Sequence, residues 1–185
     1  MSAFRFAYRI AALAAIFSVC AGGFAAQDAG QNARQVVHPT AYISANPVPR
    51  GGSLELAVVA VITTGFHVNA NKTSDDFLIP TTIDAQLPAG LRSVQTIYPA
   101  GKLKNLSFSD KPVNVYDGAV TLFIKLQVAP DAPLGDMQVP VTIRYQACSD
   151  TTCLPPVKLP VTVSLTVGAA GTKSRPQHPE IFSHQ

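Results

Sequence analysis

The sequence predicts an all-β fold, an antiparallel β-sandwich of short strands, and three observations support this class. Apolar and polar residues alternate with period two over most of residues 36–167, as in strands with one buried face. Fifteen prolines and twelve glycines occur in 185 residues, and proline breaks helix interiors. Glu55 and Glu180 are the only glutamates, so strong helix formers are few. Roughly seven to nine short strands separated by turn signals are typical of a sandwich.

The first 25 residues predict a signal peptide for export. A basic start is followed by an apolar run over residues 10–20, and Gly23 and Ala25 supply small residues before a cleavage site. The run is shorter than the roughly 20 residues that span a bilayer. We therefore expect the mature chain to lie in an oxidising compartment, the bacterial periplasm. Retention as an uncleaved anchor and lipidation at Cys20 remain open alternatives.

The strands are expected in the following order, after a flexible lead at residues 26–35. Residues 54–62 form the clearest strand and are expected to be central, because both of their faces are largely apolar. Alternation of the same quality predicts strands at 121–128, 138–145 and 158–167, and weaker alternation predicts strands at 36–43, 78–86 and 91–98. One domain therefore spans residues 36–167, and the Gly- and Pro-rich residues 168–185 are expected to form a disordered tail.

The charge balance excludes several classes of function. Arg5 and Arg9 belong to the predicted signal, and without them 12 basic side chains face 11 acidic ones. A nearly neutral domain has no electrostatic surface for nucleic acid. The sequence has no glycine-rich phosphate loop after a strand and no Gly-x-Ser-x-Gly motif. We therefore expect no nucleic acid, no small-molecule substrate and no cofactor.

Two cysteines remain after removal of the signal, Cys148 and Cys153, and in an oxidising compartment they predict one disulfide. They flank a Ser-Asp-Thr-Thr turn between two strands, so the bond would lie at the tip of a hairpin. Asp150 between them disfavours a thiolate, and the spacing is not C-x-x-C. The pair is interpreted either as a structural staple of the hairpin or as a redox pair attacked by the thiolate of a partner.

At this point the sequence resembles a known family, the N-terminal periplasmic domain of the thiol:disulfide interchange protein DsbD. The resemblance rests on a Tyr-Gln-Ala-Cys run, a second cysteine after four intervening residues and a following Leu-Pro-Pro, at residues 145–148 and 153–156. Upstream landmarks are similar too: Gly65-Phe66-His67-Val68-Asn69, Ile79-Pro80-Thr81, Leu87-Pro88-Ala89-Gly90, Tyr98-Pro99 and Val115-Tyr116-Asp117-Gly118. Together they cover residues 36–167.

The resemblance implies an immunoglobulin-like sandwich whose cysteine pair exchanges electrons with other proteins. Cys148 and Cys153 would be the redox pair, and Cys153 is expected to form the mixed disulfide with a partner. An aromatic loop caps the pair in the family, and Tyr98 is the candidate for that cap here. The side chains expected to line the site are those of Phe66, His67 and Tyr145.

The partners implied by the resemblance are thioredoxin-fold proteins of the periplasm. In DsbD a multi-helix membrane domain follows this domain, whereas the present sequence ends at Gln185, so we expect a separate membrane electron carrier. An active pair would have protein-disulfide reductase activity. The main alternative is a non-enzymatic immunoglobulin-like binding module with a structural disulfide. A metal-handling sandwich would use Cys148, Cys153 and His67, but no spacing demands it, and no metal is expected.

Overall fold

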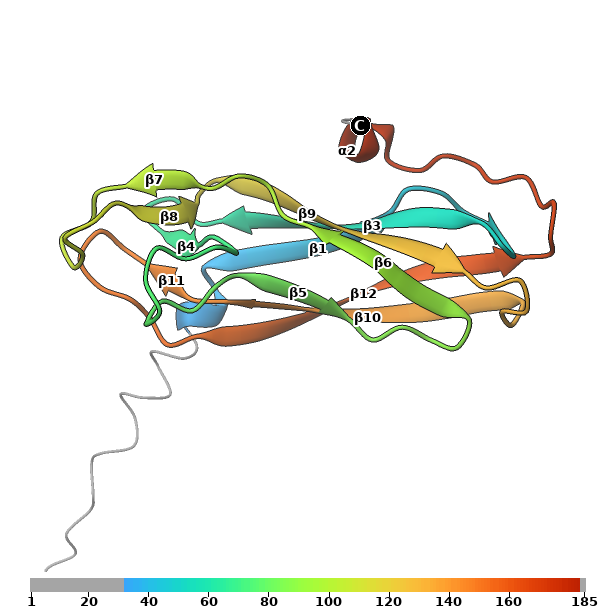
Figure 1. The fold of residues 1–185 in the computed structure, drawn as a ribbon, viewed down its shortest axis with the longest axis horizontal. Coiled ribbons are helices and arrows are strands. Elements are labelled where there is room, and N and C mark those ends of the chain that lie inside the picture. The colour runs from blue at the N-terminus through green and yellow to red at the C-terminus, as the bar shows by residue number, and fades with distance from the viewer. Residues whose placement is uncertain (1–31, 184–185) are drawn as a thin grey trace, which may run out of the picture.

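A computed structural model describes residues 32–183, and within this range the chain forms two packed β-sheets with a smaller sheet at one end (Figure 1). The strands run in chain order as β1 (Val37–Ile43), β2 (Val48–Pro49), β3 (Ser53–Ile62), β4 (His67–Asn69), β5 (Thr82–Ala85), β6 (Leu91–Ile97), β7 (Lys102–Lys104), β8 (Val113–Tyr116), β9 (Ala119–Val128), β10 (Gly135–Tyr145), β11 (Ala147–Cys148) and β12 (Val157–Gly168). A short helix, α2 (Pro179–Phe182), follows them.

The two large sheets have the strand orders β1-β3-β9-β6 and β2-β12-β10-β5. Neighbouring strands are antiparallel except β2 and β12, which are parallel. One hydrophobic core contains residues of both sheets, so they pack face to face. In β9 every second residue is buried, as the alternating sequence predicts. The architecture is an immunoglobulin-like antiparallel β-sandwich, which confirms the predicted fold class.

Strand β3 shows why some residues on its second face are apolar as well. It lies between β1 and β9, with Leu56 paired to Ile43 on one side and to Ile124 on the other. Ala57 is fully buried on the opposite face from Leu56 and Val58. The expectation of a central strand at residues 54–62 is therefore confirmed.

The third sheet, with the order β11-β4-β8-β7, lies at one end of the sandwich and consists of strands of two to four residues (Figure 1). A strand was expected to end at Cys148, but the alternation predicts none at β4, β7 or β8, because such short segments cannot show a recognisable alternation. Of the weaker candidates, residues 78–86 contain only the four residues of β5. This end sheet carries the cysteine hairpin.

The lead and the tail differ from their expected disorder within the described residues. Residues 32–34 form a helical turn, Ala33 is fully buried, and its carbonyl accepts a hydrogen bond of 2.7 Å from the Tyr145 hydroxyl. The tail turns back along the outside of the β1-β3-β9-β6 sheet (Figure 1), where Gln177 N donates to Ser44 O and the ring of Phe182 packs edge-on against Phe123. Backbone pairing and an aromatic contact hold residues that composition alone marked as mobile.

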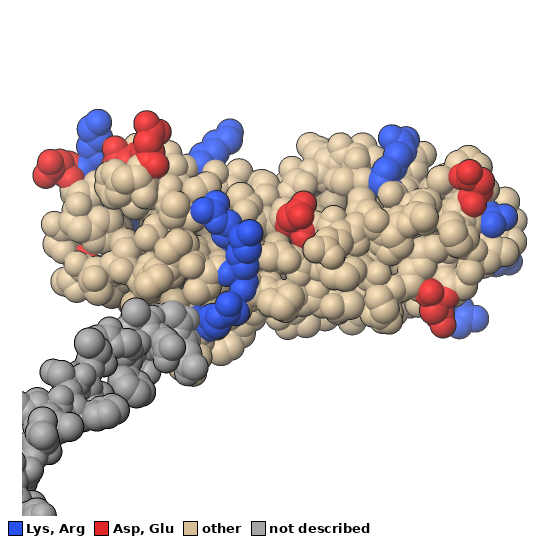
Figure 2. Space-filling model, turned by 90° about the horizontal axis from the view of Figure 1, so that it is seen from below, with Lys and Arg blue, Asp and Glu red and all other residues tan. Residues whose placement is uncertain are grey.

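Two expectations remain, namely the signal peptide and the nearly neutral surface. The predicted signal peptide, residues 1–25, lies outside the described residues, as does Cys20. Among residues 32–183, no helix is long and apolar enough to cross a membrane. Figure 2 shows that the face seen from below carries few charged side chains, with both signs interspersed.

Candidate functional site

Cys148 and Cys153 form a disulfide with an S–S distance of 2.04 Å, which confirms the predicted pairing. Cys148 ends β11, and the chain returns through a four-residue turn to pair Cys153 with it as an antiparallel bridge. Hydrogen bonds from Leu154 N to Ala147 O and from Ser149 N to Thr152 O, both 2.8 Å, flank the two cysteines. The cysteines thus occupy a non-hydrogen-bonded pair, in which opposite Cα atoms lie closest, and here they are 4.0 Å apart. This backbone arrangement lets so short a hairpin carry a disulfide.

The turn itself is closed by the hydroxyl of its first residue. Ser149 Oγ accepts hydrogen bonds from Thr151 N and Thr152 N, at 3.4 and 3.2 Å. A serine at this place in a turn replaces backbone hydrogen bonds with its side chain. The hairpin therefore has its own local support besides the disulfide.

The two cysteines differ in exposure. Cys148 is fully buried, whereas Cys153 is partly exposed at the outer side of the hairpin. A thiolate attacks a disulfide at the sulfur that it can reach. Of the two, Cys153 is thus the more accessible to another protein.

His67 lies directly beside the disulfide. The register of β4 and β11 pairs His67 with Cys148, and Cys148 is paired on its other side with Cys153. Residues opposite each other in a sheet point to the same face, with Cβ atoms about 5 Å apart. His67, Cys148 and Cys153 therefore form a lateral row on one face of the end sheet.

The imidazole of His67 is only 1% exposed, and its Nε2 has no hydrogen-bond partner among the residues that the structure describes. Burial lowers the pKa of His67, and the positive charge of Lys104 lowers it further. Asp150 and Asp117 act in the opposite direction on this pKa. The balance favours a neutral imidazole.

A network of amide side chains fixes β4 against β11. Asn69 Nδ2 donates to Ile79 O at 3.1 Å and to Gln146 Oε1 at 3.2 Å, and Gln146 Oε1 also accepts from Ile79 N at 3.2 Å. Thr81 Oγ1 donates to Asn69 O at 2.6 Å. These contacts give a physical reason for the Gln of the Tyr-Gln-Ala-Cys run and for the Ile-Pro-Thr segment: both hold the strand that carries His67.

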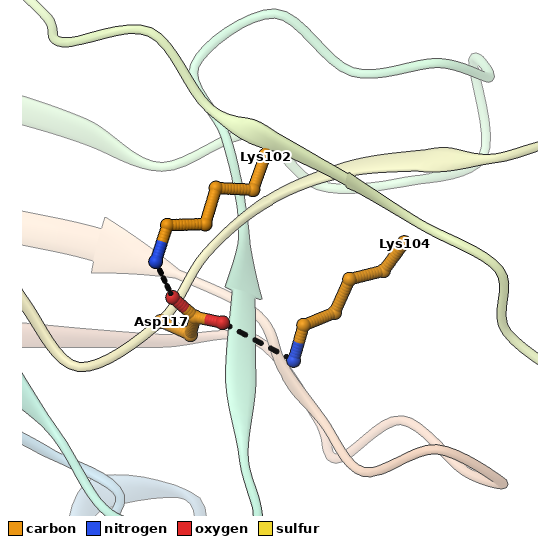
Figure 3. Close-up of polar contacts among 3 residues, drawn as sticks. All are labelled: Lys102, Lys104 and Asp117. Carbon is orange, nitrogen blue, oxygen red and sulfur yellow. Dashed lines mark hydrogen bonds and ion pairs between the residues drawn. The ribbon is translucent and has the colours of Figure 1, made fainter.

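A cavity of about 380 Å³ opens next to His67. Its lining includes Phe66, His67, Lys104, Asp117 and Asp150. Figure 3 shows the Asp117 carboxylate between two lysines, with Lys102 Nζ at 2.6 Å and Lys104 Nζ at 3.2 Å. The hydrogen bonds from these ammonium groups lower the pKa of Asp117. The cavity thus joins the buried imidazole to a set of charged groups at the surface.

Residues 105–109 contact the turn of the cysteine hairpin through Ser107. Ser107 donates to Asp150 O twice, from its backbone N at 3.3 Å and from its Oγ at 2.8 Å. The neighbouring Leu106 is buried in a small apolar cluster with Leu78, Val113 and Val115, against which Phe108 packs. Sequence reasoning missed this contact, because Ser107 and Asp150 are separated by 43 residues and belong to no recognisable pattern.

The predicted site residues are placed as follows. Phe66 and His67 line the cavity next to the hairpin. The Tyr98 hydroxyl accepts a hydrogen bond of 3.1 Å from Ile83 N, which ties β6 to β5, whereas Ser107 contacts the hairpin turn. The Tyr145 hydroxyl donates a hydrogen bond to Ala33 O in the segment before β1. Burial raises the pKa of Tyr145 to about 12. Among residues 32–183 no group of three or more His, Cys, Asp and Glu is placed to hold a metal ion.

Fold and site together define a β-sandwich that carries a hairpin disulfide at one end, with Cys148 buried and Cys153 partly exposed. The sequence profile of the family described as thiol:disulfide interchange protein DsbD, N-terminal, matches residues 33–165. The chain belongs to this family. Family membership and the disulfide together support a thiol–disulfide exchange module.

Two solved structures are similar to this chain. The Neisseria meningitidis DsbD N-terminal domain in the reduced form has 18% sequence identity and a TM-score of 0.41, over 74% of this chain and 90% of that one. The N-terminal periplasmic domain of ScsB from Proteus mirabilis has 11% identity and a TM-score of 0.48, over 78% of this chain and 51% of that one. A comparison with curated proteins finds no significant match.

Proposed function

We propose that the chain is a periplasmic module that relays electrons through Cys148 and Cys153 to or from thioredoxin-fold partners. A separate membrane electron carrier would supply the electrons. The observation that carries the proposal is the unequal exposure of the two cysteines at the edge of the end sheet. Family membership supports it as well.

The reaction needs two exchange steps. A thiolate of the reduced partner attacks Cys153 Sγ, the Cys148–Cys153 bond breaks, and Cys148 leaves as a thiolate that takes up a proton. The second thiol of the partner then attacks its own sulfur in the mixed disulfide, and Cys153 leaves as a thiolate. The partner ends as a disulfide and the module as a dithiol, so two electrons have moved. The reverse sequence passes them to the next protein.

We further propose that residues 105–109 cover the hairpin, a role that the sequence suggested for Tyr98. The two hydrogen bonds from Ser107 to Asp150 O support this proposal. Ser107 is exposed, so these bonds compete with water and contribute little net stability. A docking partner could therefore break these two bonds at small free-energy cost while Leu106 stays packed in its apolar cluster.

Trapping with a pair of matched variants tests the proposal. Cys148→Ser keeps the accessible sulfur and loses the buried one, whereas Cys153→Ser does the reverse. The remaining cysteine of each variant is activated as a mixed disulfide with thionitrobenzoate and incubated with reduced thioredoxin whose second active-site cysteine is replaced by serine, so that the attacking thiolate releases thionitrobenzoate and the adduct cannot resolve itself. Adducts are identified by non-reducing electrophoresis and mass spectrometry. We expect a stable adduct with Cys148→Ser and little with Cys153→Ser. Absence of an adduct with both variants would contradict the proposal.

A further inference from the structure

The unpartnered nitrogen of His67 calls for an explanation. Nearly every buried polar atom in a folded protein has a hydrogen-bond partner. His67 Nε2 has none among residues 32–183, although the side chain is 99% buried. The register nevertheless places this imidazole next to Cys148, the sulfur that becomes a thiol when the disulfide opens. In the oxidised protein that sulfur has no proton to give.

Opening and closing of the disulfide both require a proton transfer at Cys148. Cys148 is fully buried, and apolar burial disfavours a thiolate. When Cys148 leaves, it needs a proton, and when it attacks the mixed disulfide to release a partner, it must lose one. Cys148 is 0% exposed, so a neighbouring protein group is better placed than bulk water.

We propose that His67 exchanges this proton with Cys148, an inference that rests on the exchange function proposed above. In the release step neutral Nε2 accepts the Cys148 thiol proton, and the resulting thiolate attacks Cys153 Sγ. The bond between Cys153 and the partner breaks, and the partner leaves as a thiolate with the electron pair. In the opposite direction the imidazolium protonates Cys148 as it leaves. His67 then regains or loses its proton through the adjoining cavity.

The charged groups around the cavity suit this role. Burial, assisted by the charge of Lys104 from β7, keeps the imidazole neutral and able to accept a proton, while Asp150 in the hairpin turn and Asp117 after β8 stabilise the imidazolium once it forms. Lys104 is itself held by Asp117 at 3.2 Å, so its charge stays in place (Figure 3). The cavity lined by these side chains connects His67 to solvent.

A single-turnover reaction of the reduced protein with Ellman's reagent tests the proposal. Cys153 first attacks the reagent and releases one chromophore, and Cys148 then attacks the mixed disulfide and releases the second. We expect His67→Gln to slow the second phase about a hundredfold, the low end for general acid–base catalysis, and to remove its dependence on histidine titration. The first phase should be unchanged. His38→Gln, an exposed histidine on β1, is the matched control and should leave both phases unchanged.

A second measurement needs no variant and covers the case in which His67→Gln fails to fold. The titration of the His67 imidazole is followed by NMR in oxidised and reduced wild-type protein. We expect a lower midpoint in the reduced protein, because the Cys148 thiol can donate a hydrogen bond to neutral Nε2, and this bond is lost when the imidazole is protonated. An unchanged second phase in folded His67→Gln, or the same midpoint in both redox states, would overturn the role of His67. Exchange at full rate in His67→Gln would leave the exchange function intact, whereas absence of any mixed disulfide would refute that function itself.

Discussion

The body of the sandwich and its end sheet bury different kinds of side chain. In the body, the core between the two large sheets is built mostly from aliphatic residues, many of them on the long strands. The end sheet is made of strands of two to four residues, and the buried polar side chains of residues 32–183, namely His67, Asn69 and Thr81, all lie on β4 or are bonded to it. We infer that the body contributes most of the stability, while the end sheet adds buried polar side chains to its own apolar cluster beside the cysteine pair.

The largest expected effect comes from the body. Leu122 on β9 is fully buried, so Leu122→Ala should lower the free energy of unfolding by about 2–5 kcal/mol. The reduction potential of the cysteine pair should not change in protein that remains folded. Urea unfolding and a redox titration measure the two quantities. Val61→Ala, at a β3 residue that is 47% exposed, is the control and should change stability by less than about 0.5 kcal/mol. A large shift in potential with Leu122→Ala would contradict the separation of roles.

The disulfide should matter less for stability than that single leucine. Its loop spans a sequence separation of five, and the chain-entropy account gives about 2 kcal/mol for so short a loop. The double variant Cys148→Ser/Cys153→Ser should thus remain folded and lose all exchange activity. Comparison of its urea midpoint with that of oxidised wild type checks this. Global unfolding of the double variant would instead show that the bond is a structural staple.

The pH dependence of stability should reveal the buried histidine of the end sheet. The pKa of His67 is lowered in the folded protein, mainly by burial, so the unfolded chain binds more protons at mildly acidic pH. Stability is fully present above the unfolded pKa of about 6.5 and is lost as the pH falls through the folded pKa, with a slope of at most about 1.4 kcal/mol per pH unit. Urea unfolding of oxidised protein at several pH values measures it. His67→Gln should flatten this part of the profile, and an equally steep profile in that variant would assign the effect to another group.

A change in residues 105–109 should have the smallest effect on stability and a measurable effect on the rate at which the disulfide is reduced. Ser107→Ala removes the 2.8 Å bond from Oγ to Asp150 O and should change stability by less than about 1 kcal/mol. Reduction of the disulfide by a small dithiol should become severalfold faster, because the turn is less covered. The matched control is Ser164→Ala, which removes an exposed hydrogen bond between Gln138 on β10 and Ser164 on β12, in a sheet away from the hairpin. Equal reduction rates in both variants would argue against a covering role for residues 105–109.

The same contrast explains how far sequence reasoning reached. The strands β3, β9, β10 and β12 could be predicted because ten to twelve residues with period two leave one register possible. The cysteine pair could be predicted because spacing and compartment allow one pairing. The position of His67 opposite Cys148 could not, because it depends on the register of two very short strands that are far apart in the chain.

The contacts of residues 105–109 and of the C-terminal tail could not be predicted from the sequence for a related reason. Ser107 contacts Asp150 O, 43 residues away, through its backbone N and its hydroxyl, and the apolar cluster around Leu106 joins three separate segments. The tail is held by a hydrogen bond from Gln177 N to Ser44 O and by the packing of Phe182 against Phe123. The polar composition of the tail does not predict these contacts. Such pairings appear only when the sandwich brings distant segments together.

The reduction potential of the Cys148–Cys153 pair tests the central claim most directly. It is measured by equilibrating the purified protein in glutathione or dithiothreitol buffers and quantifying the oxidised fraction. A pair that exchanges electrons with thioredoxin-fold proteins should have a potential in the range of those proteins, roughly −120 to −270 mV. A potential below about −300 mV would identify a structural bond and contradict the account.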